Sequence, residues 1–415
     1  MPADLVFCLH SPRVMVRWAS TGGDVMSDAV HGYSAAGIPL LDGPEVIRKR
    51  PGMYVGSTSE RGLRTYVFTV SDWAVNEVLA QDAGHVEIVL ESDGGVRVAL
   101  DGLGIPVEAA GHPGTPSLEE LLTRTLVEPW RDGRRFVGAW LMGAGLFVTN
   151  ALSSRLTGEV RREGVRWVQR FDRGVAAGPP VPEGPTTDTG TVIAFLPDAD
   201  IFEVTECSFD ALAEHFRTEA FLNRALDIAL TDERPPGGPR SERFYSPGGA
   251  KDFVAFLTAG AGTSDETDVF GFEQEDPRIA GSVEVALKWS RDATGDMRTF
   301  ANSRPTPEGG VHLVGFREGV TAAVDTFARE RRLPAATTAD RVPDRLWDGL
   351  TAVVSVKLDR PEFEGSTRAV LGNAEVRESV ASAVQEHLLM WLTEDPRLAA
   401  AVADRITADT RPSGA

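Results

Sequence analysis

The stretch Leu63–Ala80, LRTYVFTVSDWAVNEVLA, decides how the first part of this chain is interpreted. Its apolar residues recur three and four positions apart, starting with Leu63 and Val67, and this spacing predicts an amphipathic helix. Two β-rich runs follow, Val86–Leu90 and Val96–Leu100, and the turn sequence ESDGG between them predicts a hairpin. A long helix followed by paired strands indicates a mixed α and β fold.

Glycines and prolines divide the rest of the chain. The DGLG sequence at Asp101–Gly104 predicts a sharp turn after the second strand, because glycine adopts positive φ without steric cost. Gly143 and Gly145 precede a predicted helix start, an arrangement that often holds an anion. The stretch Arg234–Gly249, rich in proline and glycine, is predicted as a linker. An amphipathic helix is predicted at Val376–Leu392.

Composition restricts the partners and the compartment. The 415 residues carry a net charge of −19, and such a field opposes the phosphate contacts that dominate nucleic-acid binding. The two cysteines, Cys8 and Cys207, are far apart and form no metal or redox motif. No apolar run has membrane-spanning length. We therefore expect a cytoplasmic protein with no direct DNA binding, no membrane contact and no metal site.

A series of sequence blocks resembles the ATPase and transducer region of bacterial DNA gyrase B and of its counterpart in topoisomerase IV. The most specific block is RKRPGMY, which lies within Tyr33–Gly56. Further blocks follow in the family's order: DGLGIP at Asp101–Pro106, MGAGLFVTNALS at Met142–Ser153, TGTVIAFLPD at Thr189–Asp198, FLNRALDIALTDER at Phe221–Arg234, PEGGVHLVGFREGVT at Pro307–Thr321 and PEFEGSTRAVLGNAEVR at Pro361–Arg377. This number of ordered blocks makes the resemblance specific over about residues 30–405.

The resemblance implies an α+β protein with two domains. A GHKL-type α/β sandwich with an N-terminal arm is expected over residues 31–235, and a ribosomal-S5-like transducer domain over residues 236–405. Residues 1–30 are expected to be a disordered N-terminal extension and residues 406–415 a tail. The resemblance does not extend to the TOPRIM domain that serves DNA cleavage in the family.

The nucleotide site departs from the family pattern at the positions that act on ATP. In the family, the stretch aligned with Val67–Glu77 is close to VFEVVDNAIDE; its Glu is the general base and its Asn holds magnesium. Thr69 and Trp73 stand at those two positions, and Thr65 stands where a His supports the base. Leu100 replaces the Asp that binds the adenine amino group. ATP and magnesium binding are therefore expected to be lost or weak, with no cofactor required.

The phosphate-binding parts have changed as well. The family's lid sequence GGLHGVGAS aligns with Ala139–Phe147, where bulky side chains would obstruct the close backbone approach that phosphates need. The family's QTK loop aligns with a segment in which Ser366 and Arg368 replace Gln and Lys. Arg368 remains able to pair with an anion. Thr191, which aligns with an adenine-side threonine, is retained.

The first functional hypothesis is a repurposed protein of bacterial specialised metabolism, such as antibiotic biosynthesis, whose former ATP pocket binds an apolar small molecule. ATP-independent catalysis would rest on Asp72, Asp101 and Asn76, since a carboxylate in an apolar pocket can serve as a general acid. An equally weighted alternative is that Trp140 and Phe147 fill the vacated pocket as core. The predicted pocket residues are Thr69, Trp73, Leu100, Gly102, Leu103, Gly104, Trp140, Met142, Gly143, Phe147, Thr191 and Arg368.

Two other functions remain open at this stage. The segment Tyr33–Leu41, with Tyr33 and Ile38, resembles the family's dimer-forming arm. The chain could therefore form a homodimer, or pair with a true gyrase as a non-catalytic regulatory or self-resistance protein. The third possibility, an active ATPase component of a type IIA topoisomerase working with a separate TOPRIM chain, is supported only by the shared fold.

Overall fold

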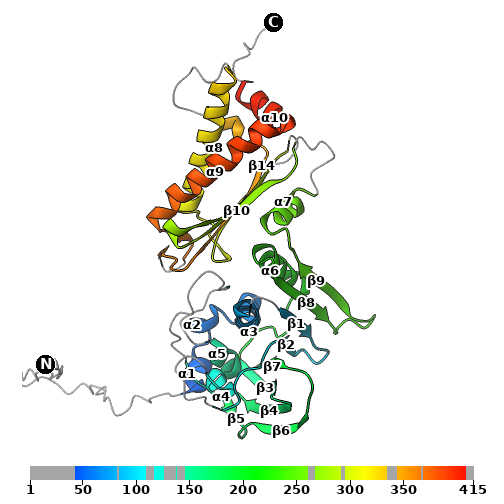
Figure 1. Ribbon diagram of the computed structural model, residues 1–415. Helices are drawn as coiled ribbons and strands as arrows, with labels where there is room; N and C mark the ends of the chain where they lie inside the picture. The colour runs from blue at the N-terminus through cyan, green and yellow to red at the C-terminus, as the bar shows by residue number, and fades with distance from the viewer. Residues whose placement is uncertain are drawn as a thin grey trace, which may run out of the picture. The chain divides into compact units, whose positions relative to one another are not determined.

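The structure is a computed structural model that describes residues 43–81, 84–108, 116–125, 137, 145–259, 267–290, 295–333, 344–365 and 368–407 (Figure 1). The expected extension over residues 1–30 and the arm residues Tyr33 and Ile38 lie outside these ranges. Among the helices of the described residues, none combines the length and the apolar character needed to cross a membrane.

The first region is a mixed sheet with the strand order β5-β4-β3-β7-β2-β1-β8-β9, and β6 pairs with β4. The predicted hairpin is confirmed: β1 (Gly84–Leu90) runs antiparallel to β2 (Val96–Leu100). On its other side β1 lies parallel to β8 (Leu226–Asp232). The remaining strands are β3 (Ser153–Arg162), β4 (Val165–Asp172), β5 (Val175–Ala176), β6 (Val181–Pro185), β7 (Gly190–Pro197) and β9 (Arg240–Tyr245).

Helices pack on this sheet and close its core (Figure 1). The predicted helix is confirmed as α3 (Glu60–Ala80), and its apolar positions Leu63, Val67 and Val70 are fully buried because they recur on one face. Neighbouring α6 (Phe209–Leu222) begins at Ser208, whose hydroxyl accepts the Ala211 N–H as an N-cap. The other helices here are α1 (Pro44–Lys49), α2 (Gly52–Val55), α4 (Leu118–Thr123) and α5 (Gly145–Leu152).

The second region is a separate sheet with the order β10-β11-β14-β12-β13. Its strand β11 (Gly281–Trp289) is buried at every position, because both faces of the sheet are covered. Val285 and Leu287 belong to the core that includes α8 and α9, whereas Ala286 belongs to the core that includes α7. The other elements are α7 (Ala250–Thr258), β10 (Phe270–Asp276), β12 (Met297–Ala301), β13 (Arg304–Pro305), α8 (Val311–Glu330), β14 (Leu350–Leu358), β15 (Phe363–Glu364), β16 (Val370–Leu371), α9 (Ala374–Glu394), α10 (Pro396–Thr407) and two short 3-10 turns at Pro277–Ile279 and Asp344–Leu346.

The linker prediction is wrong over residues 240–245. These residues form β9, which pairs antiparallel with β8, instead of an irregular connection. The first sheet therefore extends beyond the boundary expected at residue 235. Phe244 is buried on this edge strand while most of its neighbours are exposed, so the strand carries little of the alternating pattern that sequence analysis detects. The helix expected at Val376–Leu392 is confirmed as α9.

Candidate functional site

One face of α3 carries the positions that the family resemblance aligns with catalytic groups. Thr65, Thr69 and Trp73 follow one another at intervals of four residues, so their side chains lie on the same side of the helix. The hydroxyl of Thr69 donates to the carbonyl oxygen of Thr65 at 2.9 Å, and that of Thr65 donates to the carbonyl oxygen of Arg61 at 3.2 Å. Both hydroxyl protons are thus used inside the helix itself, and neither side chain offers a proton acceptor with useful basicity at neutral pH.

The bulky residues of the predicted pocket are packed as core. Trp73 is 3% exposed, Leu100 is 7% exposed and Phe147 is 6% exposed, and all three belong to the same hydrophobic core of the first region. The sequence predicts that Trp73 lines a ligand pocket. In the structure, its indole is packed among the side chains of the sheet and helices. Trp140, Met142 and Gly143 lie outside the described residues.

Asn76, one of the three predicted catalytic residues, is tied to a backbone segment. Its side-chain amide donates to the carbonyl oxygen of Val137 at 3.0 Å, and its side-chain oxygen accepts the Val137 N–H at 2.6 Å. This reciprocal pair holds the backbone of Val137, which lies 61 positions away in the sequence. Asn76 therefore has a structural contact here, and its catalytic role stays a prediction.

The turn after β2 keeps the geometry that its glycines predict. Gly102 has a φ of 129° and Gly104 a φ of 74°, both in the region that favours glycine. Asp101 is exposed at the start of this turn, and Leu103 is 75% exposed, so neither side chain is enclosed by the core. Thr191 is buried, and its hydroxyl oxygen accepts the Ile105 N–H at 3.1 Å, which holds the turn against β7.

Arg368 lies in the second region, between β15 and β16, with a φ of 52° and an exposed side chain. Burial lowers the pKa of Arg304, and the positive charge of Arg368 lowers it further. The two guanidinium groups are therefore close enough to interact. Arginine pairs well with anions, and the anion contact at Arg368 stays a prediction. The structure places Arg368 outside the core that holds the pocket residues Trp73 and Leu100.

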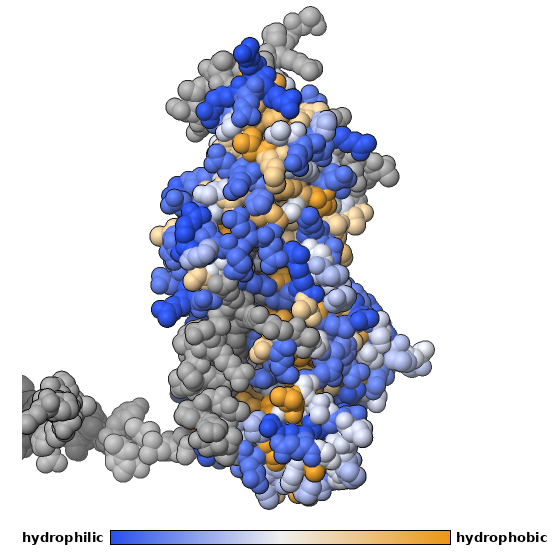
Figure 2. Space-filling model, viewed as in Figure 1, coloured by the Kyte–Doolittle hydropathy of each residue, from blue (hydrophilic) through white to orange (hydrophobic). Residues whose placement is uncertain are grey.

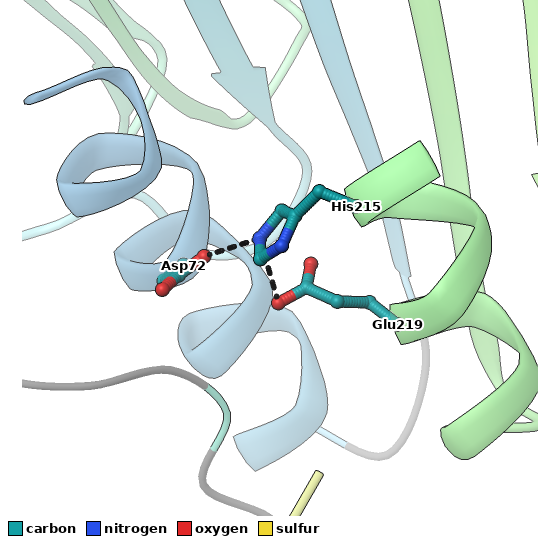
Figure 3. A group of neighbouring side chains, drawn as sticks. All are labelled: Asp72, His215 and Glu219. Atoms are coloured by element: carbon teal, nitrogen blue, oxygen red, sulfur yellow. Dashed lines mark hydrogen bonds and ion pairs between the residues drawn. The ribbon is translucent and has the colours of Figure 1, made fainter. Parts of the chain in front are cut away.

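A charged cluster lies beside the face of Thr65, Thr69 and Trp73, and the sequence did not predict it as a unit. Asp72 projects from α3, while His215 and Glu219 project from α6, one turn apart (Figure 3). The His215 Nε2 atom lies 3.1 Å from Asp72 Oδ1 and 3.3 Å from Glu219 Oε1. The ring of Phe68 stacks on the imidazole with 3.8 Å between ring centroids and thereby orients it.

The two carboxylates control the protonation of this histidine. Burial by itself would lower the pKa of His215, but the charges and hydrogen bonds of Glu219 and Asp72 outweigh it and raise the pKa to about 10. Burial raises the pKa of Glu219, with His215 acting in the opposite direction. Without another bound cation, His215 is therefore an imidazolium at neutral pH.

Of the predicted catalytic residues, Asp72 is the one that the structure places in a cluster of ionisable groups. Its partners His215 and Glu219 were missed, because Asp72 and His215 are 143 residues apart in the sequence. The signal that could have found them is the spacing of four residues between His215 and Glu219, which places both side chains on one face of a helix.

Comparisons with known proteins place this fold in a family. The family described as DNA gyrase B matches residues 249–413. DNA gyrase B of Streptomyces coelicolor is 39% identical over 389 residues, which cover 90% of this chain and 57% of that protein. DNA gyrase B of Mycolicibacterium smegmatis is 36% identical over 403 residues, which cover 90% of this chain and 59% of that protein. The chain thus spans less than two thirds of the length of these relatives.

Solved structures show the same architecture. The 43K ATPase domain of Thermus thermophilus gyrase B, solved in complex with an aminocoumarin, matches with a TM-score of 0.72 and 30% identity, covering 88% of this chain and 94% of that one. The ATP-binding domain of Francisella tularensis topoisomerase IV matches with a TM-score of 0.70 and 25% identity, covering 88% and 96%.

The fold is therefore a GHKL sandwich followed by a transducer domain, and the predicted α+β class is confirmed. The chain belongs to the DNA gyrase B family, as a homologue of its ATPase and transducer region.

Proposed function

We propose that this chain is a gyrase-B-like pseudo-ATPase that does not hydrolyse ATP. The observation that carries the proposal is Trp73, which stands where the family resemblance places the magnesium-binding Asn and is 3% exposed within the core. An indole has one N–H donor and no atom that ligates magnesium. Without the metal, the negative charge of a triphosphate lacks its usual counter-charge.

The position of the general base supports the same conclusion. Thr69 occupies it, and its hydroxyl donates to the backbone of its own helix. General-base catalysis typically contributes about 10²–10⁴-fold to a rate, and a hydroxyl near neutral pH cannot supply it. Leu100, at the adenine-binding position, is buried in the core and has no side-chain acceptor.

Steady-state ATP hydrolysis by the full chain with magnesium tests the proposal. The expected rate equals that of the blank, with the 43K ATPase domain of Thermus thermophilus gyrase B assayed alongside as the positive control. The variant Asp101→Asn, purified in the same way, distinguishes ATP hydrolysis by a contaminating enzyme from ATP hydrolysis by the chain itself. Turnover that is above the blank and is lost in this variant would refute the proposal.

We propose that this protein acts in the cytoplasm as a non-catalytic partner of gyrase. The burial of Trp73, Leu100 and Phe147 in one core supports this role, because a site filled by its own side chains requires no ligand to complete it. The net charge of −19 opposes direct DNA binding, and the face shown in Figure 2 is mostly hydrophilic. By pairing with gyrase, the chain would then regulate the activity of gyrase or act as a self-resistance protein.

Co-purification of the tagged full chain with gyrase B from the same cells tests this role. The expected outcome is a mixed complex in native mass spectrometry and a changed rate of DNA supercoiling by the reconstituted gyrase. A homodimer alone, with the supercoiling rate unchanged at equimolar chain, would contradict it.

The second candidate role is binding of an apolar small molecule in specialised metabolism, with or without ATP-independent catalysis by Asp72 and Asp101. The apolar character of Trp73, Leu100 and Phe147 favours it over any nucleotide ligand. Because these side chains are packed, a ligand would have to displace them. Saturable stabilisation by an apolar metabolite in a thermal-shift assay, reduced in Trp73→Phe, would support it, and no shift across an apolar panel would count against it.

A further inference from the structure

Three possible metal-ligand atoms converge between α3 and α6 (Figure 3). They are one carboxylate oxygen each of Asp72 and Glu219 and a ring nitrogen of His215, and they all lie within 4.8 Å of one another. His215 and Glu219 come from successive turns of α6, and Asp72 reaches them from the adjacent helix. The group thus comes from two rigid helices rather than from a loop.

We propose that Asp72, His215 and Glu219 bind a divalent transition-metal cation, with zinc as the best match. Zinc takes imidazole nitrogen and carboxylate oxygen at bonds of about 2.0–2.1 Å in tetrahedral sites, which separates neighbouring ligand atoms by about 3.3 Å. The observed separations of 3.1 Å and 3.3 Å from His215 Nε2 already match this spacing. The carboxylate oxygens of Asp72 and Glu219, which lie within 4.8 Å of each other, would take up the same spacing when the ion is bound.

Glu219 provides a second, independent indication. Its side chain is 4% exposed, and both carboxylate oxygens are buried without a hydrogen-bond donor, apart from the ion pair with His215. Buried polar atoms in proteins are almost always satisfied, and those that are not often mark an ion or water site. A cation between Glu219 and Asp72 would satisfy these oxygens.

An imidazolium is the alternative occupant, and it satisfies the group less well. His215 Nε2 faces both carboxylates, yet it carries at most one hydrogen. One hydrogen cannot make two well-directed bonds to Asp72 and Glu219 together. A divalent cation with neutral imidazole would contact both carboxylates at once and balance their two negative charges.

The surroundings suit a site that remains partly open. The His215 side chain is 28% exposed, so an ion and a water molecule can reach the group from that side. Three protein ligands leave one tetrahedral position for this water. The metal would join α3 to α6 directly beside Thr69 and Trp73, and would hold the remodelled face in place. Phe68, which stacks on the imidazole, would act as a positioning residue.

Zinc titration of the metal-free full chain, monitored by calorimetry with a competing chelator, tests the site. We expect one zinc ion per chain. His215→Gln and Glu219→Gln should each weaken zinc binding more than about 100-fold, since loss of outer-shell partners alone costs about 10–100-fold. His85→Gln is the matched control, because His85 pairs with Asp227 at 3.3 Å and, among the described residues, belongs to no group of three possible metal ligands; its zinc affinity should equal that of the unmodified chain.

Cobalt supplies a spectroscopic test whose first part uses the unmodified chain and so does not depend on the stability of any variant. Cobalt bound to the unmodified chain should give the intense visible absorption of a tetrahedral site, and His215→Cys should add a thiolate-to-cobalt charge-transfer band. Absence of one-to-one binding, a weak octahedral cobalt spectrum, or equal zinc affinity in folded Glu219→Gln would each overturn the proposal.

Discussion

Two neighbouring faces of α3 differ in their chemistry. On one face, none of the three side chains of Thr65, Thr69 and Trp73 is ionisable; the two hydroxyl groups are bonded within the helix, and the indole lies in the core. The adjacent face presents Phe68 and Asp72 to α6, where they meet an imidazole and a second carboxylate. Because apolar packing holds α3 on the sheet, the chemistry of its other faces can change without loss of the fold.

Truncation of Trp73 tests whether the first face is core, and it has the largest expected effect. Trp73→Ala should lower the free energy of unfolding by about 3–5 kcal/mol, because it leaves a cavity among buried side chains. Urea denaturation measures the loss, with Leu103→Ala, a change at a 75% exposed side chain, as a control expected within about 0.5 kcal/mol. A loss under about 1 kcal/mol for Trp73→Ala would show that the indole borders an open pocket instead.

Removal of the imidazole tests the second face. In metal-free protein, His215→Ala should cost about 3 kcal/mol, since it leaves two carboxylates without their cation in a mostly buried site. The matched change His85→Ala removes a more exposed partner of Asp227 and should cost about 0–1 kcal/mol. Equal losses in the two variants would mean that the cluster on α3 and α6 is no more than a surface ion pair.

The pH dependence of stability compares the cluster with a buried histidine of the second region. The pKa of His215 is raised to about 10, so its contribution to the metal-free protein is complete below about pH 6.5 and is lost as the pH rises toward 10. Burial lowers the pKa of His312 to about 4, so its contribution is complete above about pH 6.5 and is lost as the pH falls toward 4.

Urea midpoints measured across this pH range in the presence of a chelator should therefore fall at both ends. His215→Gln should flatten the alkaline decline, and His312→Asn the acidic one. If His215→Gln left the alkaline decline unchanged, the proposed imidazolium between two carboxylates would be wrong.

The smallest effect is expected at Thr69. Thr69→Val should change the free energy of unfolding by no more than about 0.5 kcal/mol, because the hydroxyl only bonds the carbonyl oxygen one turn earlier in its own helix. Thermal denaturation of the two proteins in parallel suffices as the measurement. A loss above about 1.5 kcal/mol would show that the hydroxyl serves a further partner, and the contrast between the two faces of α3 would weaken.

These contrasts also explain what the sequence could predict. The spacing of Leu63, Val67 and Val70 predicts α3, since burial on one face repeats with the helical period. By contrast, β9 was missed because its residues show little alternation of buried and exposed positions and its flanks are rich in proline and glycine, which predict a linker. The cluster of Asp72 and His215 was missed for a different reason, since these residues are 143 positions apart and only the packing of α3 beside α6 brings them together.

Within the candidate site, the sequence specifies which chemical groups are absent, but it does not specify where the replacing side chains point. Substitution by Thr69, Trp73 and Leu100 removes the expected base, metal ligand and adenine acceptor whatever the geometry. Whether a tryptophan lines a pocket or fills a core depends on neighbouring elements that are distant in sequence. In the structure the core accounts for Trp73 and Phe147.

Binding of a non-hydrolysable ATP analogue tests most directly whether the first face of α3 has lost its nucleotide chemistry. Calorimetric titration of the full chain with the analogue and magnesium should give no saturable heat, while the ATP-binding domain of Francisella tularensis topoisomerase IV serves as the positive control under the same conditions. One-to-one binding of the analogue that depends on magnesium would contradict the account, because it would require Trp73 to leave the core and another group to hold the metal.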